Sequence, residues 1–533
     1  MKLNKRHFYS WILAVAFLVV LLQLFLWPKL TTTFALPISK AEPLKLELKT
    51  DSFYKGYLSC SSLQSRISDF LKSHYVYNNF DEEISQRTFH MYFRFLDPGK
   101  LYFTEKDIEA FKKHEKNLGR EIGKQNCNFI VDVYSLYKTR VQNATELIYK
   151  RLKIPFNFKI DEFIETDRKK VSWAVQESEL TERWRKLLKF IILNMKDSDN
   201  DKKIIERLNK RYQLILKNVL ERKSDEVFSI FLNAFALSLD PHSGYLTPPD
   251  QAQFEIDFSL KLSGIGASLT NIDGYTIVNE LIPGGAASKD GRLKKGDKII
   301  AVDPGDGSGN QDVVDMDLSK VVQLIRGKEN TPVKLSILRK EADGQKRIQI
   351  ELIRAVVQNK DSEAKSDILE VSGKRIGVIS LPSFYIDYQG CQLNSKTCRS
   401  SSNDMTREIL SLSAKKVDGI IVDLRKNIGG DLYECAKIVG QFIDNPLVVQ
   451  TVERLNRVRV LEEKAKAIYH GPLEILISKY TASASEILAG AVQDYGRGIV
   501  AGSTRSFGKA TVQSVITIPG TFGRANDGAL RVT

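Results

Sequence analysis

Hydrophobic positions change their spacing along this chain, and each change marks a new region. Residues 52–248 carry apolar side chains at the three- and four-residue spacing of amphipathic helices, between charged faces and with few glycines or prolines. Asp97 and Asp240 each precede a proline after an apolar stretch, which predicts a helix end followed by a turn. The predicted helices cover residues 63–77, 83–96, 105–122, 129–152, 181–195 and 202–220.

Short strands and glycine-rich turns replace the helical pattern between residues 258 and 354. The pattern predicts a helix at 317–325, and strands at 275–278, 299–302 and 332–338. Strands and helices then alternate in the last region, which predicts βαβ crossovers and a partly parallel sheet. Reactive groups are expected at the carboxyl ends of its strands. Those strands are predicted at 376–381, 419–425 and 474–478, with helices at 405–412 and 433–442.

Ser483 begins an apolar helical segment directly after the last of these strands. A serine at a helix start lies among unpaired N–H groups that favour negative charge on nearby oxygen atoms, which suits a nucleophile. The simpler interpretation is a helix cap, because Ser-x-x-Glu patterns such as Ser483 to Glu486 are common at helix starts. Lys509, in a turn after a short strand, could likewise be only a solvated loop lysine.

Together, these motifs resemble those of the tail-specific protease family, the C-terminal processing peptidases. The resemblance rests on Ser-Ala-Ser-Glu at the helix start, Gln-Asp-Tyr-Gly-Arg after it, and Phe-Gly-Lys-x-Thr-Val-Gln beyond the next strand. It implies a serine–lysine dyad with Ser483 as nucleophile and Lys509 as general base. Gln513 and Asp494 would support the dyad, and Asp494 is expected to act structurally and at a distance. Two features depart from the family pattern: Ala510 stands where glycine is usual, and the preceding loop is one residue longer, so that Lys509 follows Ser483 by 26 positions.

Glycines 429 and 430 follow the strand at 419–425 and would let the backbone approach a substrate closely, although they also suit a helix-entry turn. The family resemblance implies an oxyanion hole formed by the N–H groups of Gly429 and Ala484. Asp423 and Arg425, at the strand end, are expected to form a structural pair.

A lysine base must be uncharged, and at pH 7 this costs about 4–5 kcal/mol for a side chain whose pKa is about 10.4. Burial can lower a lysine pKa by about 3–5 units. We therefore expect Lys509 to be enclosed with few carboxylates nearby, and Gln513 to orient its amine without adding charge.

The region 258–354 resembles a PDZ domain of the rearranged kind found in bacterial proteases. In such a domain, backbone N–H groups of a glycine-rich turn bind the terminal carboxylate of an extended peptide that adds a strand to the sheet. The expected partners are thus protein substrates with exposed C-terminal tails, although the glycines could serve only a tight turn. The tail-binding loop would be Gly264, Ile265, Gly266 and Ala267, and Val321, Leu324 and Ile325 could line the side-chain pocket.

Two other functions stay open. One is a non-catalytic PDZ adaptor or chaperone on a degenerate protease body. The other is a Ser–His hydrolase using His242 or His470, which is disfavoured because neither histidine lies in a nucleophile-linked motif.

The first 36 residues predict export. Lys2, Lys5 and Arg6 precede an apolar run at residues 11–27, and Thr-Phe-Ala at 33–35 suits a signal-peptide cleavage site. The alternative is an uncleaved anchor in the inner membrane. The family resemblance implies a periplasmic location, and a homo-oligomer is a further open expectation. The net charge of +14 is dispersed without an arginine stripe, so no nucleic-acid partner is expected.

Five cysteines cannot all pair, and Cys391 with Cys398 is the candidate disulfide, in a polar, turn-rich segment. The sequence contains no CxxC or HExxH motif, and neither a metal nor another cofactor is expected.

The predicted fold class is a multidomain α and α/β protein. It comprises a signal peptide or anchor at 1–36, an N-terminal helical domain at 37–250, and a PDZ domain at 257–356 inserted before a crotonase/ClpP-like serine protease body at 365–533. The chain stops inside a predicted strand, where long family members continue, so the body is expected to be incomplete at its C-terminus.

Overall fold

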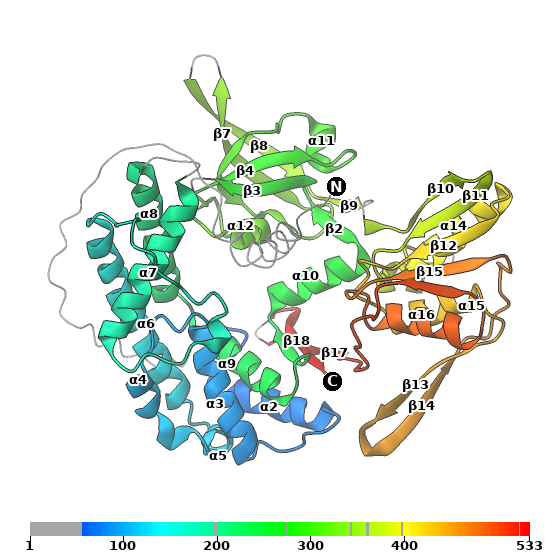
Figure 1. Ribbon diagram of the computed structural model, residues 1–533. Helices are drawn as coiled ribbons and strands as arrows, with labels where there is room; N and C mark the ends of the chain where they lie inside the picture. The colour runs from blue at the N-terminus through cyan, green and yellow to red at the C-terminus, as the bar shows by residue number, and fades with distance from the viewer. Residues whose placement is uncertain are drawn as a thin grey trace. The chain divides into compact units, whose positions relative to one another are not determined.

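The computed structural model describes residues 56–196, 201–272, 274–341, 344–358, 362–395, 398–521 and 523–533. The predicted export segment lies outside these residues. Among the described helices, none combines the length and the apolar character needed to cross a membrane. The chain forms two compact units (Figure 1). One contains Met195–Leu214 and Leu262–Val357, and the other contains Phe53–Asn194, Ile215–Lys261 and Gln358–Thr533.

The helical region follows the predicted pattern closely. Ser59 and Asp81 cap the first two of its helices with their side chains, and Asp97 and Asp240 end two helices as expected. Its apolar faces meet in an aromatic core that includes Phe89, Phe93, Phe129 and Phe231. The main helices are α2 (Cys60–Ser73), α3 (Glu82–Leu96), α6 (Asn128–Leu152), α7 (Glu177–Met195), α8 (Asp201–Leu220) and α9 (Ser224–Leu239).

The prediction of a single helix at 105–122 is wrong. The structure has α4 (Glu105–Glu109), a 3-10 turn at Lys112–His114 and α5 (Leu118–Gly123). Hydrogen bonds to the third preceding residue, such as His114 N–H to the Phe111 carbonyl at 2.9 Å, replace the α-helical bonds between the two pieces. The apolar spacing alone does not distinguish these two geometries.

The PDZ region contains β3 (Ala267–Ile272), β4 (Tyr275–Leu281), β5 (Lys298–Asp303), β7 (Pro332–Glu341) and β8 (Gly344–Ile353) as successive neighbours in one sheet. Helix α12 (Leu318–Ile325) packs its apolar side onto the same core. Val321 and Ile325 are fully buried there and are not available to line an open pocket, whereas Leu324 is only partly buried.

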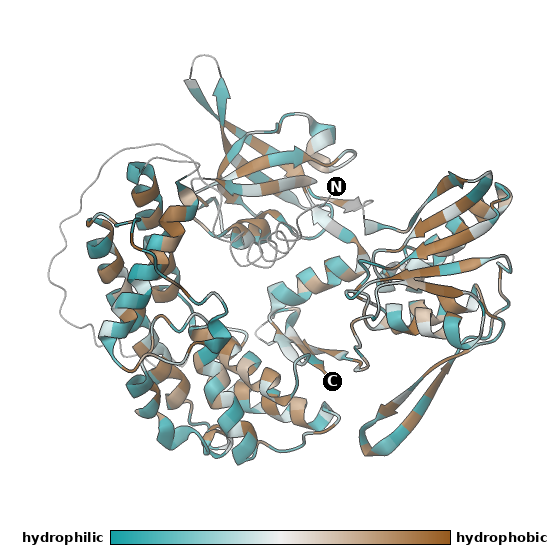
Figure 2. Ribbon diagram, viewed as in Figure 1, coloured by the Kyte–Doolittle hydropathy of each residue, from teal (hydrophilic) through white to brown (hydrophobic). Residues whose placement is uncertain are grey.

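The C-terminal region contains a five-stranded sheet in the order β10 (Lys365–Val371), β11 (Lys374–Ser380), β12 (Gly419–Asp423), β15 (Leu473–Ile477) and β16 (Ile499–Gly502). The last four strands are mutually parallel and β10 is antiparallel, which confirms the predicted partly parallel sheet. Figure 2 shows that the central strands β12 and β15 are largely hydrophobic, and Ile420 and Val422 of β12 and Leu473 and Ile475 of β15 are buried in the core.

Three helices complete this core: α14 (Ser401–Ala414), α15 (Leu432–Gly440) and α16 (Ala484–Asp494). Helices α14 and α16 pack against the sheet, and α15 packs against both of them. Because α16 directly follows the carboxyl end of β15, Ser483 lies at the edge where reactive groups are expected.

A second, three-stranded sheet joins distant parts of the chain. It has the order β1 (Gly244–Leu246), β18 (Asn526–Val532) and β17 (Ser514–Pro519). The Tyr245 hydroxyl donates to the Asp527 carbonyl at 2.7 Å, and Arg531 Nε donates to the His242 carbonyl at 2.9 Å. This pairing places the turn after α9 beside the segment that follows Lys509.

Two disulfides are present. Cys391–Cys398 was the candidate pair, whereas Cys60–Cys127 was not expected, because nothing in its sequence spacing marks it. Cys435 is a buried free thiol.

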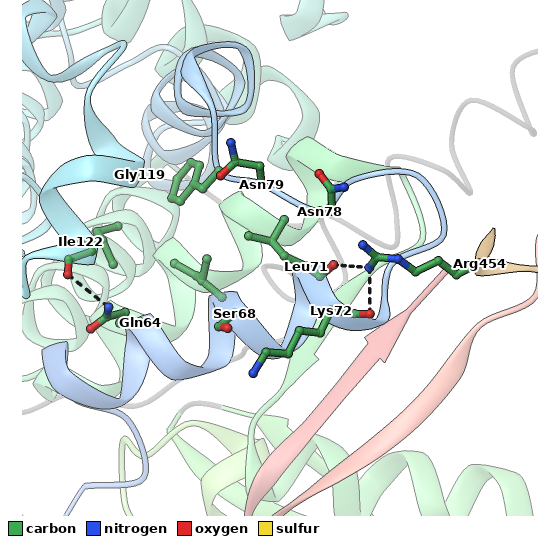
Figure 3. Close-up of a pocket in the computed structure, with 12 residues that line it drawn as sticks. Gln64, Ser68, Leu71, Lys72, Asn78, Asn79, Gly119, Ile122 and Arg454 are labelled. Carbon is green, nitrogen blue, oxygen red and sulfur yellow. Dashed lines mark hydrogen bonds between the residues drawn. The ribbon is translucent and has the colours of Figure 1, made fainter.

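A hairpin of β13 (Leu447–Glu453) and β14 (Arg457–Glu462) contributes Arg454 to the end of α2. The Arg454 guanidinium donates to the carbonyls of Leu71 and Lys72 at 2.7 and 2.8 Å, a favourable place for a positive charge at a helix C-terminus (Figure 3). These residues line a cavity of about 370 Å³, to which no predicted catalytic residue contributes.

Candidate active site

Ser483 has an unusual backbone conformation at the start of α16. Its φ and ψ angles are 58° and −121°, a region that costs a non-glycine residue about 1–3 kcal/mol. The surrounding loop is held to the turn after β12: Ala482 N–H and the Ser485 hydroxyl both donate to the Asn427 carbonyl, at 3.2 and 3.1 Å. Such stored strain is typical of functional positions, and the sequence pattern gave no sign of it.

Gly429 lies directly against Ser483. A Cβ atom at position 429 would lie 2.9 Å from the Ser483 Cβ and 3.3 Å from the Ala484 nitrogen, and the φ of Gly429 is +106°. Only glycine fits this contact. Gly429 therefore brings the backbone of its turn close to Ser483, while its close approach to a substrate stays a prediction.

The two N–H groups predicted for the oxyanion hole differ in availability. Gly429 N–H donates to the Asn427 side-chain oxygen at 2.8 Å, so in this conformation it is occupied, contrary to the prediction. Asn427 is fully buried, and its amide is fixed from the other side by the Leu381 carbonyl at 3.0 Å. Ala484 N–H has no hydrogen-bond acceptor among the described residues.

Glu486 joins the serine segment to the lysine segment. Its carboxylate accepts from Ser483 N–H at 2.7 Å and Lys509 N–H at 2.8 Å, and also from the Ser506 hydroxyl and Gly508 N–H at 2.6 and 2.5 Å. Burial opposes its charge, but these four donors hold the pKa of Glu486 below its usual value. The Ser-x-x-Glu pattern signalled the contact to Ser483; nothing signalled the contacts to the lysine loop.

The Lys509 side chain is half-buried, and its amine donates to the Thr511 carbonyl at 2.6 Å and to Gln513 Oε1 at 2.7 Å. Burial lowers the pKa of Lys509, the charge of Arg531 lowers it further, and Glu486 and Asp240 partly oppose this. No hydrogen bond joins the amine to Ser483 Oγ among those of the described residues. Lys509 is thus less enclosed, and has more carboxylates nearby, than the sequence predicted.

Gln513 is at the site, where it accepts from the amine of Lys509. Asp494 is not. It is the last residue of α16, exposed and eleven positions from Ser483, or about 16 Å along a helix. This position is compatible with the predicted role, which is structural and at a distance.

Neither of the two histidines considered as bases makes a hydrogen bond with Ser483 among the described residues. Burial and the charge of Lys509 lower the pKa of His242, which follows the Asp240 turn, and His470 is exposed. Asp423 and Arg425 form the expected pair, with an Nη2–Oδ2 distance of 2.6 Å.

The predicted tail-binding loop connects β2 (Lys261–Gly264) to β3. Its carbonyls are occupied: Ile265 O accepts from Ala287 N–H at 2.7 Å, and Gly266 O accepts from Ile282 N–H at 2.8 Å. The N–H groups of Ile265 and Gly266 make no hydrogen bond within the described part of the chain. Gly266 has a φ of +72°. Two free donors at the start of β3 suit a carboxylate.

Three family models match the chain in order. Residues 66–249 match the tail-specific protease N-terminal domain, 253–338 the PDZ domain, and 375–533 peptidase family S41. These matches and the fold define a PDZ-containing peptidase-family protein with a helical N-terminal domain.

Two relatives identified by sequence agree with this class. A tail-specific protease of Haemophilus influenzae is 35% identical over 83% of this chain and 62% of its own length. A carboxyl-terminal-processing protease of Picosynechococcus is 29% identical over 59% of this chain and 70% of its own. A solved photosystem II D1 C-terminal processing protease is 22% identical, covering 60% of this chain and 80% of its own, with a TM-score of 0.31. Over most of its length the chain is similar to tail-specific proteases.

We predict that Glu486→Gln destabilises the protein by about 1–3 kcal/mol at pH 7. The glutamine amide is uncharged, and its single oxygen cannot accept all four hydrogen bonds that the carboxylate accepts. The pKa of Glu486 is depressed in the folded state, so its contribution is complete above about pH 4.5, the ordinary value, and decreases as the pH falls below it. Urea unfolding at pH 7 and at pH 3.5 measures both effects.

Glu146→Gln is the matched control, since Glu146 is exposed on α6 and makes no hydrogen bond among the described residues. Equal stability of the two variants at pH 7 would contradict the role assigned to Glu486.

Proposed function

We propose that this protein is an exported serine endopeptidase that cleaves peptide bonds with Ser483 and Lys509. The observation that carries the proposal is the Glu486 carboxylate, which ties the serine-bearing helix start and the lysine-bearing loop together at the edge of the parallel sheet. The strained Ser483 backbone and the lowered pKa of Lys509 support the same function.

The first chemical step needs a neutral Lys509. Its amine takes the proton of the Ser483 hydroxyl while Oγ attacks the carbonyl carbon of the substrate. The free Ala484 N–H is available to the resulting oxyanion, and Gly429 N–H would join it if the Asn427 side chain turned away. Two such donors would stabilise the transition state by several kcal/mol.

Collapse of the tetrahedral intermediate breaks the peptide bond. The leaving amine takes the proton from the Lys509 ammonium, and an acyl-enzyme remains on Ser483. Water then gives a proton to Lys509 and attacks the ester. As the bond to Ser483 Oγ breaks, Lys509 returns this proton to Oγ, which restores the serine and releases the new carboxyl terminus.

The geometry also favours a second candidate, the PDZ adaptor. The amine of Lys509 makes no hydrogen bond to Ser483 in the described structure, and Gly429 N–H is occupied. Catalysis therefore requires a rearrangement of this loop, whereas an adaptor would need none. Loss of cleavage on substitution of the dyad residues separates the two functions.

We assign tail recognition to the loop Gly264–Ala267, supported by its two free N–H groups and by the PDZ match. Of the three residues predicted to line the side-chain pocket, Leu324 is the one left partly exposed for a substrate side chain. The chain spans 62% of the length of its Haemophilus relative, so substrates and partners of the whole protein are part of this proposal. A periplasmic location, an inner-membrane anchor and a homo-oligomer belong to it as well.

We predict that Ser483→Ala and Lys509→Ala each reduce cleavage of an unfolded protein by about 10³-fold or more. In the unsubstituted chain, kcat/KM should rise with pH, because the base must lose its proton. The midpoint of this rise should reflect the Lys509 pKa, which is below 10.5. Lys415→Ala, at an exposed lysine after α14, is the control and should cleave normally. Retained cleavage in Lys509→Ala with loss in His242→Ala would favour a Ser–His mechanism instead.

For tail recognition, we predict that amidating the C-terminus of a peptide weakens its binding roughly tenfold, since an amide loses the charge that two free N–H donors would bind. Fluorescence anisotropy on the Ser483→Ala chain measures this binding without cleavage. Equal affinity of the acid and the amide would remove the loop from carboxylate recognition.

A further inference from the structure

The acceptors around Lys509 match the requirements of a neutral amine. Such an amine has two N–H donors and one lone pair, and here the two donors have two acceptors, the Thr511 carbonyl and Gln513 Oε1. With both N–H bonds occupied, the lone pair is the part of the amine left for a serine proton. The orientation of the Gln513 amide therefore matters to the base.

An amide side chain has nearly the same shape when it is flipped, so its orientation must come from its partners. Gln513 Nε2 donates to the Thr511 hydroxyl and to the Thr533 hydroxyl, both at 3.1 Å. A hydroxyl can donate only one proton. Thr533 Oγ1 donates its proton to Asp240 Oδ1 at 2.9 Å, and so it must accept from Gln513.

Asp240 is held as an acceptor by several donors. Its Oδ1 accepts from the N–H groups of His242 and Ser243 at 2.7 and 3.0 Å, and its Oδ2 accepts from the Ser243 hydroxyl at 2.5 Å. Burial opposes the charge, but these donors, His74 and Thr533 together hold the pKa of Asp240 well below its usual value. An ionised carboxylate can only accept, which fixes the direction of the Thr533 bond.

His74 supplies a further fixed donor. Its Nδ1 accepts from the N–H groups of Val76 and Tyr77 at 3.1 and 3.0 Å, so in the neutral ring the proton is on Nε2. Nε2 lies 2.9 Å from Asp240 Oδ2, and the ring is 2% exposed.

We propose that Asp240 and Thr533 are positioning residues for the general base, acting through Gln513. Carboxylate, hydroxyl, amide and amine form one directional chain that ends with Gln513 Oε1 facing Lys509. Without the Thr533–Asp240 bond, the hydroxyl is free to donate to Gln513 Oε1, and a flipped amide then turns its NH₂ group toward the amine. The inference rests on the proposed Ser–Lys function. It links Asp240, in the turn after α9, to the orientation of the general base.

The Thr533 hydroxyl is not needed to hold the strand in place. Thr533 N–H donates to the Ser243 hydroxyl at 3.2 Å, and the Thr533 carbonyl accepts from Tyr75 N–H at 2.9 Å. Both bonds involve the main chain and are kept when the side chain is changed. A variant without the hydroxyl should therefore fold.

The test compares Thr533→Val with Thr533→Ser in the full chain. The two variants differ in the hydroxyl, which valine lacks and serine keeps. We expect Thr533→Val to lower kcat roughly five- to tenfold with KM unchanged, the effect of one lost hydrogen bond, and Thr533→Ser to retain most of the activity. In a Gln513→Ala background the valine substitution should have no further effect, because the chain acts through Gln513.

Equal kcat values for the valine and serine variants, or a full additional loss in the Gln513→Ala background, would overturn the inference. If Ser483→Ala and Lys509→Ala still abolish cleavage in that case, the dyad stands and only the positioning role fails. Cleavage that survives Lys509→Ala would instead overturn the dyad itself. Circular dichroism melting of both Thr533 variants should give the same midpoint, and a lower midpoint for valine alone would assign the loss to folding.

Discussion

The candidate site depends on one carboxylate. Glu486 accepts hydrogen bonds from the main chain of Ser483 on one side and from the main chain of Gly508 and Lys509 on the other. These two segments are 26 residues apart and belong to different loops of the sheet. Because the carboxylate binds the backbone of Ser483 and Lys509 rather than their side chains, it fixes where the two segments run and leaves the Ser483 hydroxyl and the Lys509 amine free for other partners.

The same arrangement has an electrostatic cost. A carboxylate close to a lysine stabilises the ammonium, which is the wrong form for a base. Glu486 and Asp240 both act in this direction on Lys509, while burial and the charge of Arg531 act against them and lower the pKa overall. The neutral side chain of Gln513 contacts the Lys509 amine directly. Neither carboxylate is hydrogen-bonded to the amine in the described structure.

The sequence predicted the regular elements, because helical spacing and strand alternation are local signals. The serine and lysine motifs are local as well, and the assignment of Ser483 and Lys509 as reacting groups stays a prediction. Prediction from the sequence failed where geometry depends on residues far apart. The strained Ser483 backbone follows from packing against the turn at Asn427, and the contact between Thr533 and Asp240 joins positions 293 residues apart. Asp494, for which the sequence predicted a structural role at a distance, lies a full helix away from the serine.

The most direct measurement of the central claim is the rate at which a fluorophosphonate labels Ser483, followed by intact mass and peptide mapping across pH. The account predicts labelling at Ser483 alone, at a rate that rises with pH through a lysine pKa below 10.5 and that falls sharply in Glu486→Gln. Labelling at an unchanged rate in Glu486→Gln, or none at Ser483 in the unsubstituted chain, would contradict it.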